Sequence, residues 1–202
     1  AKAFFTDLGF ENTVTGQQVF GGHGYIREWG QEQLVRDARI TQIYEGTNGI
    51  QAMDLLMRKV AGSKGALLKV FTDQVNTFIE SNKDDHTMNE FIIPLVAALT
   101  DLTELTTDLL DKSQNDINEL GASANDYLHV FGYTAMAFVW AKMAQVSLSQ
   151  QQSDGESGED FYQSKLHTAR YFFTRLLPRR LSLIASAKSG SDCLFDINDE
   201  LF

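Results

Sequence analysis

The sequence contains few of the residues that cross-link or interrupt a fold. Its 202 residues include one cysteine, Cys193, and two prolines, Pro94 and Pro178. A single thiol cannot form an internal disulfide, so no covalent cross-link is expected and a reducing cytoplasm is the natural compartment. The scarcity of proline, together with the near absence of alternating β-branched runs, favours an all-helical chain.

Long hydrophobic runs and excess positive charge are also missing. The longest apolar stretches, "FIIPLVAAL" and "YTAMAFVWAKMAQV", are shorter than the roughly 20 residues that a membrane span needs. A formal net charge of −10, spread along the chain, repels phosphate backbones and anionic membrane surfaces. We therefore expect no membrane span and no nucleic-acid partner. The chain begins without Met inside a periodic pattern, as a piece of a longer protein would.

Apolar residues recur at helical spacing in the first part of the chain. The patterns predict helices over residues 5 to 20, 30 to 43 and about 47 to 60. Leu34 and Ile43 belong to the expected apolar face of the second helix. Either Thr47 or Asn48 is suited to cap the third.

Four longer patterns follow the glycine and serine cluster "AGSKG". They cover residues 65 to 81, 88 to 112, 122 to 150 and 160 to 188. Short polar connections, including "SQQQSDGESGED", predict an antiparallel helical bundle. Gly132 would allow a neighbour to approach the third helix closely, and Pro178 predicts a break in the fourth. We expect an all-α fold in two parts, residues 1 to 61 and residues 62 to 202.

Two motifs in the first part each allow two interpretations. "FGGHGY" is either a helix stop with a tight turn or a backbone contact for phosphate, and no strand precedes Gly21 as a dinucleotide-binding fold requires. "VRDARI" places Arg36 and Arg39 on one helical face, either as a phosphate or subunit contact or as a solvated ion-pair face. His23 has no second histidine or cysteine at metal-ligand spacing, so we expect no metal site.

The stretch "QIYEGTNGIQ" lies where two helical patterns meet. Gly46 suits a left-handed residue after a helix, and Thr47 or Asn48 suits the cap of the next one. A plain turn does not account for Tyr44 or Glu45. A carboxylate held near a carbonyl compound and partly stripped of water can remove the adjacent proton, while N–H groups of the turn bind the developing oxyanion.

The segment "QQVFGGHGYIREWGQEQLVRDARITQIYEGTNGIQAMDLLMRKV" resembles the C-terminal end of the acyl-CoA dehydrogenase flavoproteins. The motifs Gln-x-x-Gly-Gly, Arg-Asp-Ala and Tyr-Glu-Gly-Thr occur in the order and spacing of that family. Residues 5 to 60 carry the resemblance. Residues 65 to 202 resemble the helical extension of a longer bacterial subgroup, similar to enzymes acting on fatty acyl-CoA or 3-methylmercaptopropionyl-CoA.

The resemblance implies a chemical role for the turn. Glu45 corresponds to the base that removes the α-proton of an acyl-CoA thioester while the β-hydrogen leaves as hydride to FAD. Its backbone N–H would help bind the thioester oxygen. Tyr44 and Gly46 would line the acyl site.

The resemblance also implies contacts with FAD. Gln18, Gly21 and Gly22 correspond to a segment that reaches the cofactor of a neighbouring subunit, and Thr47 corresponds to a threonine that contacts FAD. Some family members have a glutamine that contacts FAD at the position of Gly49. Implied partners are an electron-transfer flavoprotein and a second copy of the chain, in a bacterial cytoplasm.

Three hypotheses follow for the protein as a whole. The first is an FAD-dependent acyl-CoA dehydrogenase active in lipid metabolism. The N-terminal helical and middle β-domains of that family are absent from this sequence, so the chain alone is expected to be inactive, with Glu45 exposed to water. The second is that residues 65 to 202 form an assembly or partner-docking module. The third is a catalytically inactive homologue.

Overall fold

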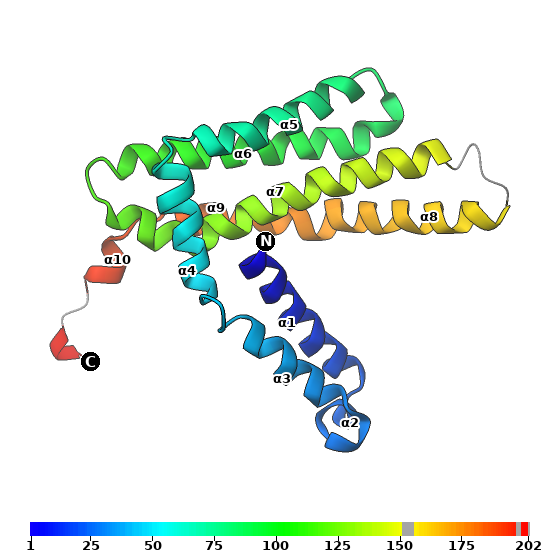
Figure 1. Cartoon of the computed structure of the whole chain (residues 1–202), viewed down its shortest axis with the longest axis horizontal. Helices are drawn as coiled ribbons and strands as arrows, with labels where there is room; N and C mark the ends of the chain where they lie inside the picture. Colours follow the sequence, from blue (N-terminus) through cyan, green and yellow to red (C-terminus); the bar gives the residue numbers. More distant parts are fainter. Residues whose placement is uncertain (151–155, 197–198, 202) are drawn as a thin grey trace.

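The computed structural model describes residues 1 to 150, 156 to 196 and 199 to 201. Over these ranges the chain forms helices and connecting turns and no β-strand. The predicted all-α class is confirmed. The helices form a long bundle and a shorter helical pair that projects from it (Figure 1).

The bundle consists of helices that run back and forth along one axis (Figure 1). In chain order they are α5 (Ala66–Asn82), α6 (Asn89–Lys112), α7 (Asn118–Gln150), α8 (Glu156–Tyr171) and α9 (Arg180–Ala187). The predicted antiparallel arrangement is confirmed. Helix α8 begins earlier than the sequence suggested, and part of the predicted polar loop before it lies outside the described residues.

Helix α7 lies at the centre of the bundle and contacts α6, α8 and α9. Helix α6 contributes a row of fully buried leucines, namely Leu95, Leu102, Leu105 and Leu109. Helix α7 contributes small buried residues, namely Ala137, Ala141 and Ala144. Each buried leucine contributes about 1.5–3 kcal/mol, and the alanines let neighbouring helices approach.

One polar pair is enclosed within this core. The Tyr127 hydroxyl and Thr106 Oγ1 lie 2.8 Å apart, and Thr106 also donates to the Leu102 carbonyl at 2.7 Å. Burial raises the pKa of Tyr127 to about 12, although the hydrogen bond with Thr106 partly opposes this shift. The phenol is therefore neutral and hydrogen-bonded inside the bundle.

The helix that starts at α8 breaks at Pro178, as predicted. A π-helical segment, η4 (Phe172–Leu176), and a 3-10 turn, η5 (Leu177–Arg179), separate α8 from α9. Proline lacks the N–H that a continuous α-helix needs, so the helical pattern changes there. The break places Arg180 against Asp101 of α6, with Nε and Oδ2 2.8 Å apart.

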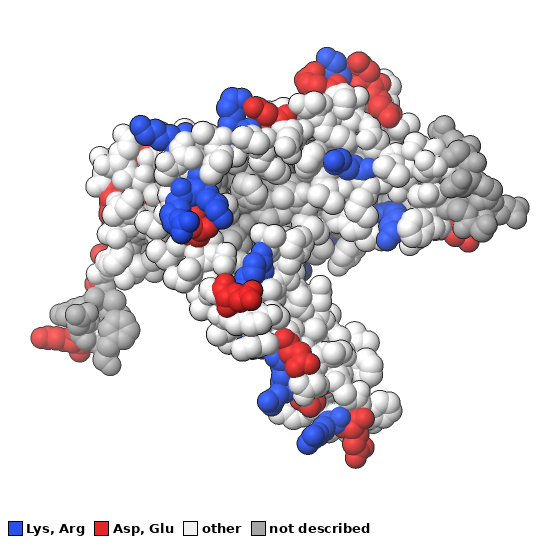
Figure 2. Space-filling view, viewed as in Figure 1, with Lys and Arg blue, Asp and Glu red and all other residues white. Residues whose placement is uncertain are grey.

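The projecting pair, which we call the arm, comprises residues 1 to 47. It contains α1 (Lys2–Val19), α2 (Gly22–Tyr25), the 3-10 turn η1 (Arg27–Trp29) and α3 (Gln31–Thr41). On the face shown in Figure 2, charged side chains of both signs are scattered along the arm and the bundle, with wide uncharged areas between them.

The apolar face predicted for the second helix is not buried. Helix α3 has no buried residue, and both Leu34 and Ile43 are exposed. The spacing of the apolar residues is helical, but no part of the chain that the structure describes covers Leu34 and Ile43. Only Ala3 and Phe4 of α1 are buried, and both lie where the arm meets the bundle.

Phe4 joins the arm to the bundle. Its ring packs against Tyr133 and His129 of α7, with centroid distances of 5.3 and 5.6 Å. A Cβ atom at Gly132 would overlap the Phe4 ring. The predicted close approach at Gly132 is thus confirmed, and the group that approaches is an aromatic ring from the arm.

A continuous helical segment connects the arm to α5. It starts as α4 (Asn48–Met53) and continues as the π-helical η2 (Asp54–Ala61). This segment lies across one end of the bundle (Figure 1). It ends at "GSKG", where Lys64 and Gly65 both have positive φ, of 52° and 79°. Beyond α9 the described chain adds α10 (Asp192–Phe195) and η6 (Asp199–Leu201).

Candidate active site

The turn between α3 and α4 contains two left-handed residues in succession. Glu45 has φ 53° and Gly46 has φ 85°. The left-handed glycine was predicted. The left-handed Glu45 was not, and for a residue with a Cβ this conformation costs about 1–2 kcal/mol. Such a conformation persists where surrounding contacts hold the backbone.

Hydrogen bonds fasten both carbonyl groups in the middle of the turn. Lys2 Nζ donates to the Gly46 carbonyl at 2.8 Å, and Gln51 Nε2 donates to the Glu45 carbonyl at 3.2 Å. The Asn48 N–H closes the loop on the Gln42 carbonyl at 3.2 Å. The backbone that carries Glu45 is therefore held from three directions.

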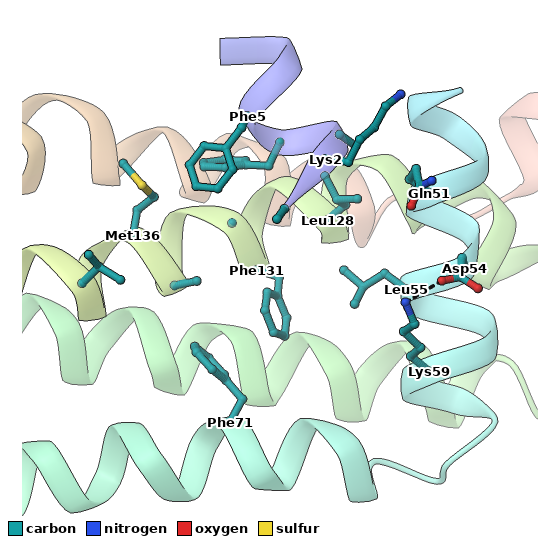
Figure 3. A pocket seen from close by; sticks show the side chains of 16 residues that line it. Lys2, Phe5, Gln51, Asp54, Leu55, Lys59, Phe71, Leu128, Phe131 and Met136 are labelled. Carbon is teal, nitrogen blue, oxygen red and sulfur yellow. Dashed lines mark ion pairs between the residues drawn. The ribbon is translucent and has the colours of Figure 1, made fainter. Parts of the chain in front are cut away.

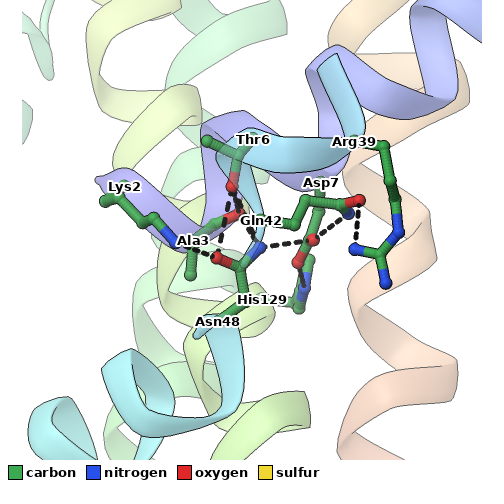
Figure 4. Close-up of polar contacts among 8 residues, drawn as sticks. All are labelled: Lys2, Ala3, Thr6, Asp7, Arg39, Gln42, Asn48 and His129. Carbon is green, nitrogen blue, oxygen red and sulfur yellow. Dashed lines mark hydrogen bonds and ion pairs between the residues drawn. The ribbon is translucent and has the colours of Figure 1, made fainter. Parts of the chain in front are cut away.

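Asn48 is the polar centre behind the turn (Figure 4). Its Nδ2 donates to Asp7 Oδ1 at 2.6 Å and to Thr6 Oγ1 at 2.9 Å. Its Oδ1 accepts from Lys2 Nζ at 2.8 Å. Helix α4 begins at Asn48, but Thr47, in the cap position, makes no side-chain cap bond. Thr47 thus occupies the predicted N-cap position without making a side-chain bond there, and the Asn48 side chain is bonded to α1.

Asp7 connects both ends of the turn with the bundle. Besides Asn48, its Oδ1 accepts from Gln42 Nε2 at 2.6 Å. Its Oδ2 lies 3.0 Å from His129 Nε2 on α7. Arg39 extends the chain of contacts by donating to Gln42 Oε1 at 3.0 Å (Figure 4). Sequence reasoning missed Lys2, Asp7 and His129, because they become neighbours only when the arm packs on α7.

The side chains predicted to perform chemistry point to solvent. Glu45 and Tyr44 are both exposed. Within the described part of the chain, the Glu45 carboxylate has no hydrogen bond or ion pair. Over the same residues, the N–H groups of Glu45, Gly46 and Thr47 donate no hydrogen bond. The turn thus offers an acid and three adjacent unused donors.

The predicted cofactor segment at Gln18, Gly21 and Gly22 lies elsewhere. Helix α1 ends at Val19 and Gly21 has φ 58°, which confirms the helix stop and tight turn expected from "FGGHGY". All three residues are exposed, and a Cβ at either glycine would meet no atom within 4 Å. A flat group can therefore approach this backbone without steric hindrance.

The structure does not bring the two predicted cofactor segments together. Thr47 adjoins Asn48, which contacts Thr6 near the start of α1, whereas Gln18 lies at the other end of that helix. At a rise of 1.5 Å per residue, Thr6 and Gln18 are separated by about 18 Å. Figure 1 shows the two segments at opposite ends of the arm. The segments at Thr47 and Gln18 are therefore placed to contact either distant parts of one large bound molecule or two separate bound molecules.

A cavity of about 420 Å³ lies behind the turn, between α1, η2, α5 and α7. Phe71 and Phe131 line it and pack against each other, with ring centroids 4.9 Å apart, and Gln51, Asp54 and Lys59 line one side (Figure 3). The hydrogen bond from Lys59, together with nearby Arg58, holds the pKa of Asp54 below its usual range. The cavity is thus mainly apolar, with an ion pair at its edge.

The remaining predicted motifs have mainly local contacts. Arg39 bonds Gln42 and lies 6.0 Å above the Phe10 ring, and His23 packs edge-on against Trp29 at 5.0 Å. Among the residues that the structure describes, no three His, Cys, Asp or Glu side chains gather as metal ligands. None of the described helices is long and apolar enough to cross a bilayer.

The described structure is thus a helical domain in which the candidate catalytic acid, Glu45, is exposed. Another protein surface or a bound molecule can reach it. Residues 1 to 60 match the family model described as "Acyl-CoA dehydrogenase, C-terminal domain". Residues 71 to 198 match the model described as "Acetyl-CoA dehydrogenase C-terminal like". The chain therefore belongs to the acyl-CoA dehydrogenase family, as the sequence motifs predicted.

Curated relatives agree with this assignment. The chain is 28% identical to a butyryl-CoA dehydrogenase of Syntrophomonas wolfei, over 100% of this chain and 33% of the relative. It is 30% identical to the broad-specificity linear acyl-CoA dehydrogenase FadE5 of Mycobacterium tuberculosis, over 100% and 34%. It is 32% identical to the 3-methylmercaptopropionyl-CoA dehydrogenase of Ruegeria pomeroyi, over 87% and 30%. The chain thus spans about a third of the length of these relatives.

Proposed function

We propose that this chain is the C-terminal part of an FAD-dependent acyl-CoA dehydrogenase, with Glu45 as the catalytic base. The main support is the turn itself, which holds Glu45 in a left-handed conformation with its carboxylate projecting freely. In the proposed reaction Glu45 accepts the α-proton of an acyl-CoA thioester. FAD, when bound, supplies the acceptor for the β-hydride.

The N–H groups of the turn would stabilise the oxyanion. As the α-proton leaves, negative charge develops on the thioester oxygen. The unused N–H groups of Glu45 and its two successors lie on the same turn as the base. Donors fixed before the reaction stabilise such charge without reorganisation, which is worth about 3–4 kcal/mol for one donor. Tyr44 and Gly46 would then flank the acyl group.

FAD would be held from the two ends of the arm. Thr47 offers an exposed hydroxyl beside the base, and the Gln18 amide with the open backbone at Gly21 and Gly22 offers a second contact. Their separation along α1 is compatible with contacts to the cofactors of two subunits in a homo-oligomer. We also propose an electron-transfer flavoprotein as electron acceptor, and a bacterial cytoplasmic location in fatty acid β-oxidation.

The chain by itself is proposed to be inactive. A carboxylate base needs partial removal of water to work on a weakly acidic α-proton, and Glu45 is exposed here. Residues 1 to 61 would form the catalytic edge, and residues 62 to 202 a helical extension. Other parts of the full-length protein would have to cover the turn and enclose the substrate.

The decisive experiment is Glu45→Gln in the full-length protein loaded with FAD. We expect turnover of butyryl-CoA, the substrate named for one relative, to fall at least ~1,000-fold, while flavin absorbance of the purified protein is unchanged. Glu28→Gln, another exposed acid on the arm, is the matched control and should keep turnover. Wild-type turnover by Glu45→Gln would disprove the base role. Absence of flavin bleaching in the unaltered protein with an acyl-CoA panel would favour a catalytically inactive homologue.

An assembly or docking role for the bundle is the second candidate. Leu67 and Val70 of α5 are more than half exposed on the outside of the bundle. Removing residues 65 to 202 from the full-length protein and measuring its mass in solution would test this role. Fewer subunits per assembly than in the unaltered protein would support it, whereas an unchanged number of subunits with altered acyl-chain preference would favour a role at the substrate site.

A further inference from the structure

We propose that Asp7 and His129 are positioning residues through which the C-terminal bundle holds the Glu45 turn in its working geometry. The inference rests on the proposed function, because it assigns to Glu45 the role of base. It gives the bundle a specific part in the reaction, which neither the family match nor the relatives' names supply.

The carboxylate of Asp7 contacts three separate segments at once. One oxygen, Oδ1, accepts from Gln42 on the α3 side of the turn and from Asn48 on the α4 side, both at 2.6 Å. The other oxygen, Oδ2, faces His129 Nε2 of α7 at 3.0 Å. One side chain thus joins both ends of a seven-residue loop to the central helix of the bundle.

The surroundings favour strong contacts at this position. The side chains of Asp7 and His129 are only 26% and 16% exposed, so water competes weakly for them. The Phe4 ring packs against the imidazole of His129 and limits its movement. Hydrogen bonds to an ionised carboxylate are about twice as strong as neutral ones. Without the Asp7 carboxylate, the half-buried amides of Gln42 and Asn48 would each lose an acceptor.

Loss of this contact should move the base. The left-handed backbone at Glu45 is strained, and the bonds of Asp7 to Gln42 and Asn48 add to those of Lys2 and Gln51 in opposing its relaxation. Displacement of a catalytic group by about 1 Å can lower a rate by roughly 100-fold. Asp7 and His129 touch neither the carboxylate of Glu45 nor the open side of the turn, so they would act only through its position.

The chain provides a matched control for a general loosening of the arm. Glu11 lies one turn further along α1 and also bonds the bundle, with Arg179 Nη1 at 3.1 Å from its Oε1. Glu11 has no contact with the turn among the described residues. Glu11→Ala therefore breaks an arm-to-bundle contact without touching Asp7, Gln42 or Asn48.

Hydrogen–deuterium exchange on this chain tests the mechanical part without cofactor or substrate. We expect Asp7→Ala and His129→Ala to raise amide exchange in the peptide covering residues 42 to 51 by about 5- to 10-fold. Exchange in the middle of α6 should stay unchanged, which shows that the variant is folded. His129→Gln, whose amide can replace the imidazole donor, should restore slow exchange. The proposal would be overturned if residues 42 to 51 exchanged no faster in Asp7→Ala and His129→Ala than in Glu11→Ala.

Kinetics of the full-length, FAD-loaded protein test the catalytic part. We expect His129→Ala and Asp7→Ala to lower kcat for butyryl-CoA by about 10- to 100-fold with little change in KM. The double variant should lose little more than Asp7→Ala alone, because both residues act through one contact. A kcat equal to that of Glu11→Ala would refute the positioning role. Full turnover by Glu45→Gln would instead refute the base assignment, so the two failures are distinguishable.

Discussion

The bundle and the arm contain similar apolar residues but bury them to different extents. Leu105 in the middle of α6 is fully buried, whereas Leu34 in the middle of α3 is 52% exposed. In the bundle, α7 receives the apolar faces of several other helices. In the arm, α1 and α3 have mainly each other as neighbours. Periodicity therefore specifies which face of a helix is apolar, but it does not specify that the same chain covers it.

The candidate site lies where these two regions meet. Its turn belongs to the arm, but Asp7 beneath the turn contacts His129 of the bundle. Phe4 inserts beside the same histidine. The well-packed region thus stabilises the part of the arm that carries Glu45, and the rest of the arm remains open to other surfaces.

The largest contrast is expected for matched leucine substitutions. Leu105→Ala should lower the free energy of unfolding by about 3–4 kcal/mol, because it leaves a cavity in the bundle core. Leu34→Ala should change the same free energy by less than about 0.5 kcal/mol, because water already contacts that side chain. Urea unfolding of the two variants measures both values. Equal losses would mean that the arm has a core of its own.

Tyrosines should distinguish the two regions at high pH. The pKa of Tyr127 is raised to about 12 in the folded bundle, against 10.0 for an exposed tyrosine. Below pH 10 both folded and unfolded chains carry the neutral Tyr127 phenol, so this group does not make stability depend on pH there. Above pH 10 the unfolded chain ionises first, and stability should fall by about 2–3 kcal/mol as the pH approaches 12.

The comparison of two phenylalanine variants isolates this effect. Tyr127→Phe should remove that part of the pH dependence between pH 10 and 12, measured by urea unfolding. Tyr25→Phe, at an exposed position on the arm, should leave it as in the unaltered chain. An identical slope for both variants would assign the high-pH loss to other groups.

The junction between the regions is tested at Gly132. An added methyl group would overlap the Phe4 ring, so Gly132→Ala should displace Phe4 and cost about 1–3 kcal/mol. Protease cleavage within α1 should become faster, because the start of the arm loses its anchor. Gly121→Ala, on the same helix with open space at the Cβ position, is the control and should be neutral or stabilising. Unchanged cleavage would show that other contacts are sufficient to hold the arm.

The sequence predicts most of the fold because helical spacing and helix breakers are local features. The bundle helices, the break at Pro178 and the left-handed Gly46 were all read from neighbouring residues. The exposure of the apolar side chains of α3 was not predicted, because burial depends on contacts with other parts of the fold.

The candidate site was predictable only in part for the same reason. Motif spacing singled out Glu45, and its role as base stays a prediction. The contacts behind it join Asp7 and His129, which are 122 residues apart in sequence. No local sequence pattern marks such a pair. Lys2 was also missed, because the sequence predicts that the first helix begins at residue 5, whereas α1 begins at Lys2.

The smallest expected change in stability concerns the open surface of the arm. Ile40 is half exposed on α3, so Ile40→Ser removes apolar surface that water already contacts. The free energy of unfolding of this variant should change by less than about 0.5 kcal/mol.

The same variant tests self-association through the arm. If the exposed face of α3 pairs with another copy of the chain, sedimentation at high protein concentration should shift toward the monomer in Ile40→Ser. Lys69→Gln, a polar change on the exposed side of α5, should alter neither measurement. A loss of more than about 2 kcal/mol for Ile40→Ser would show that α3 packs in solution against a surface of the same chain, and the contrast between arm and bundle would then be one of degree.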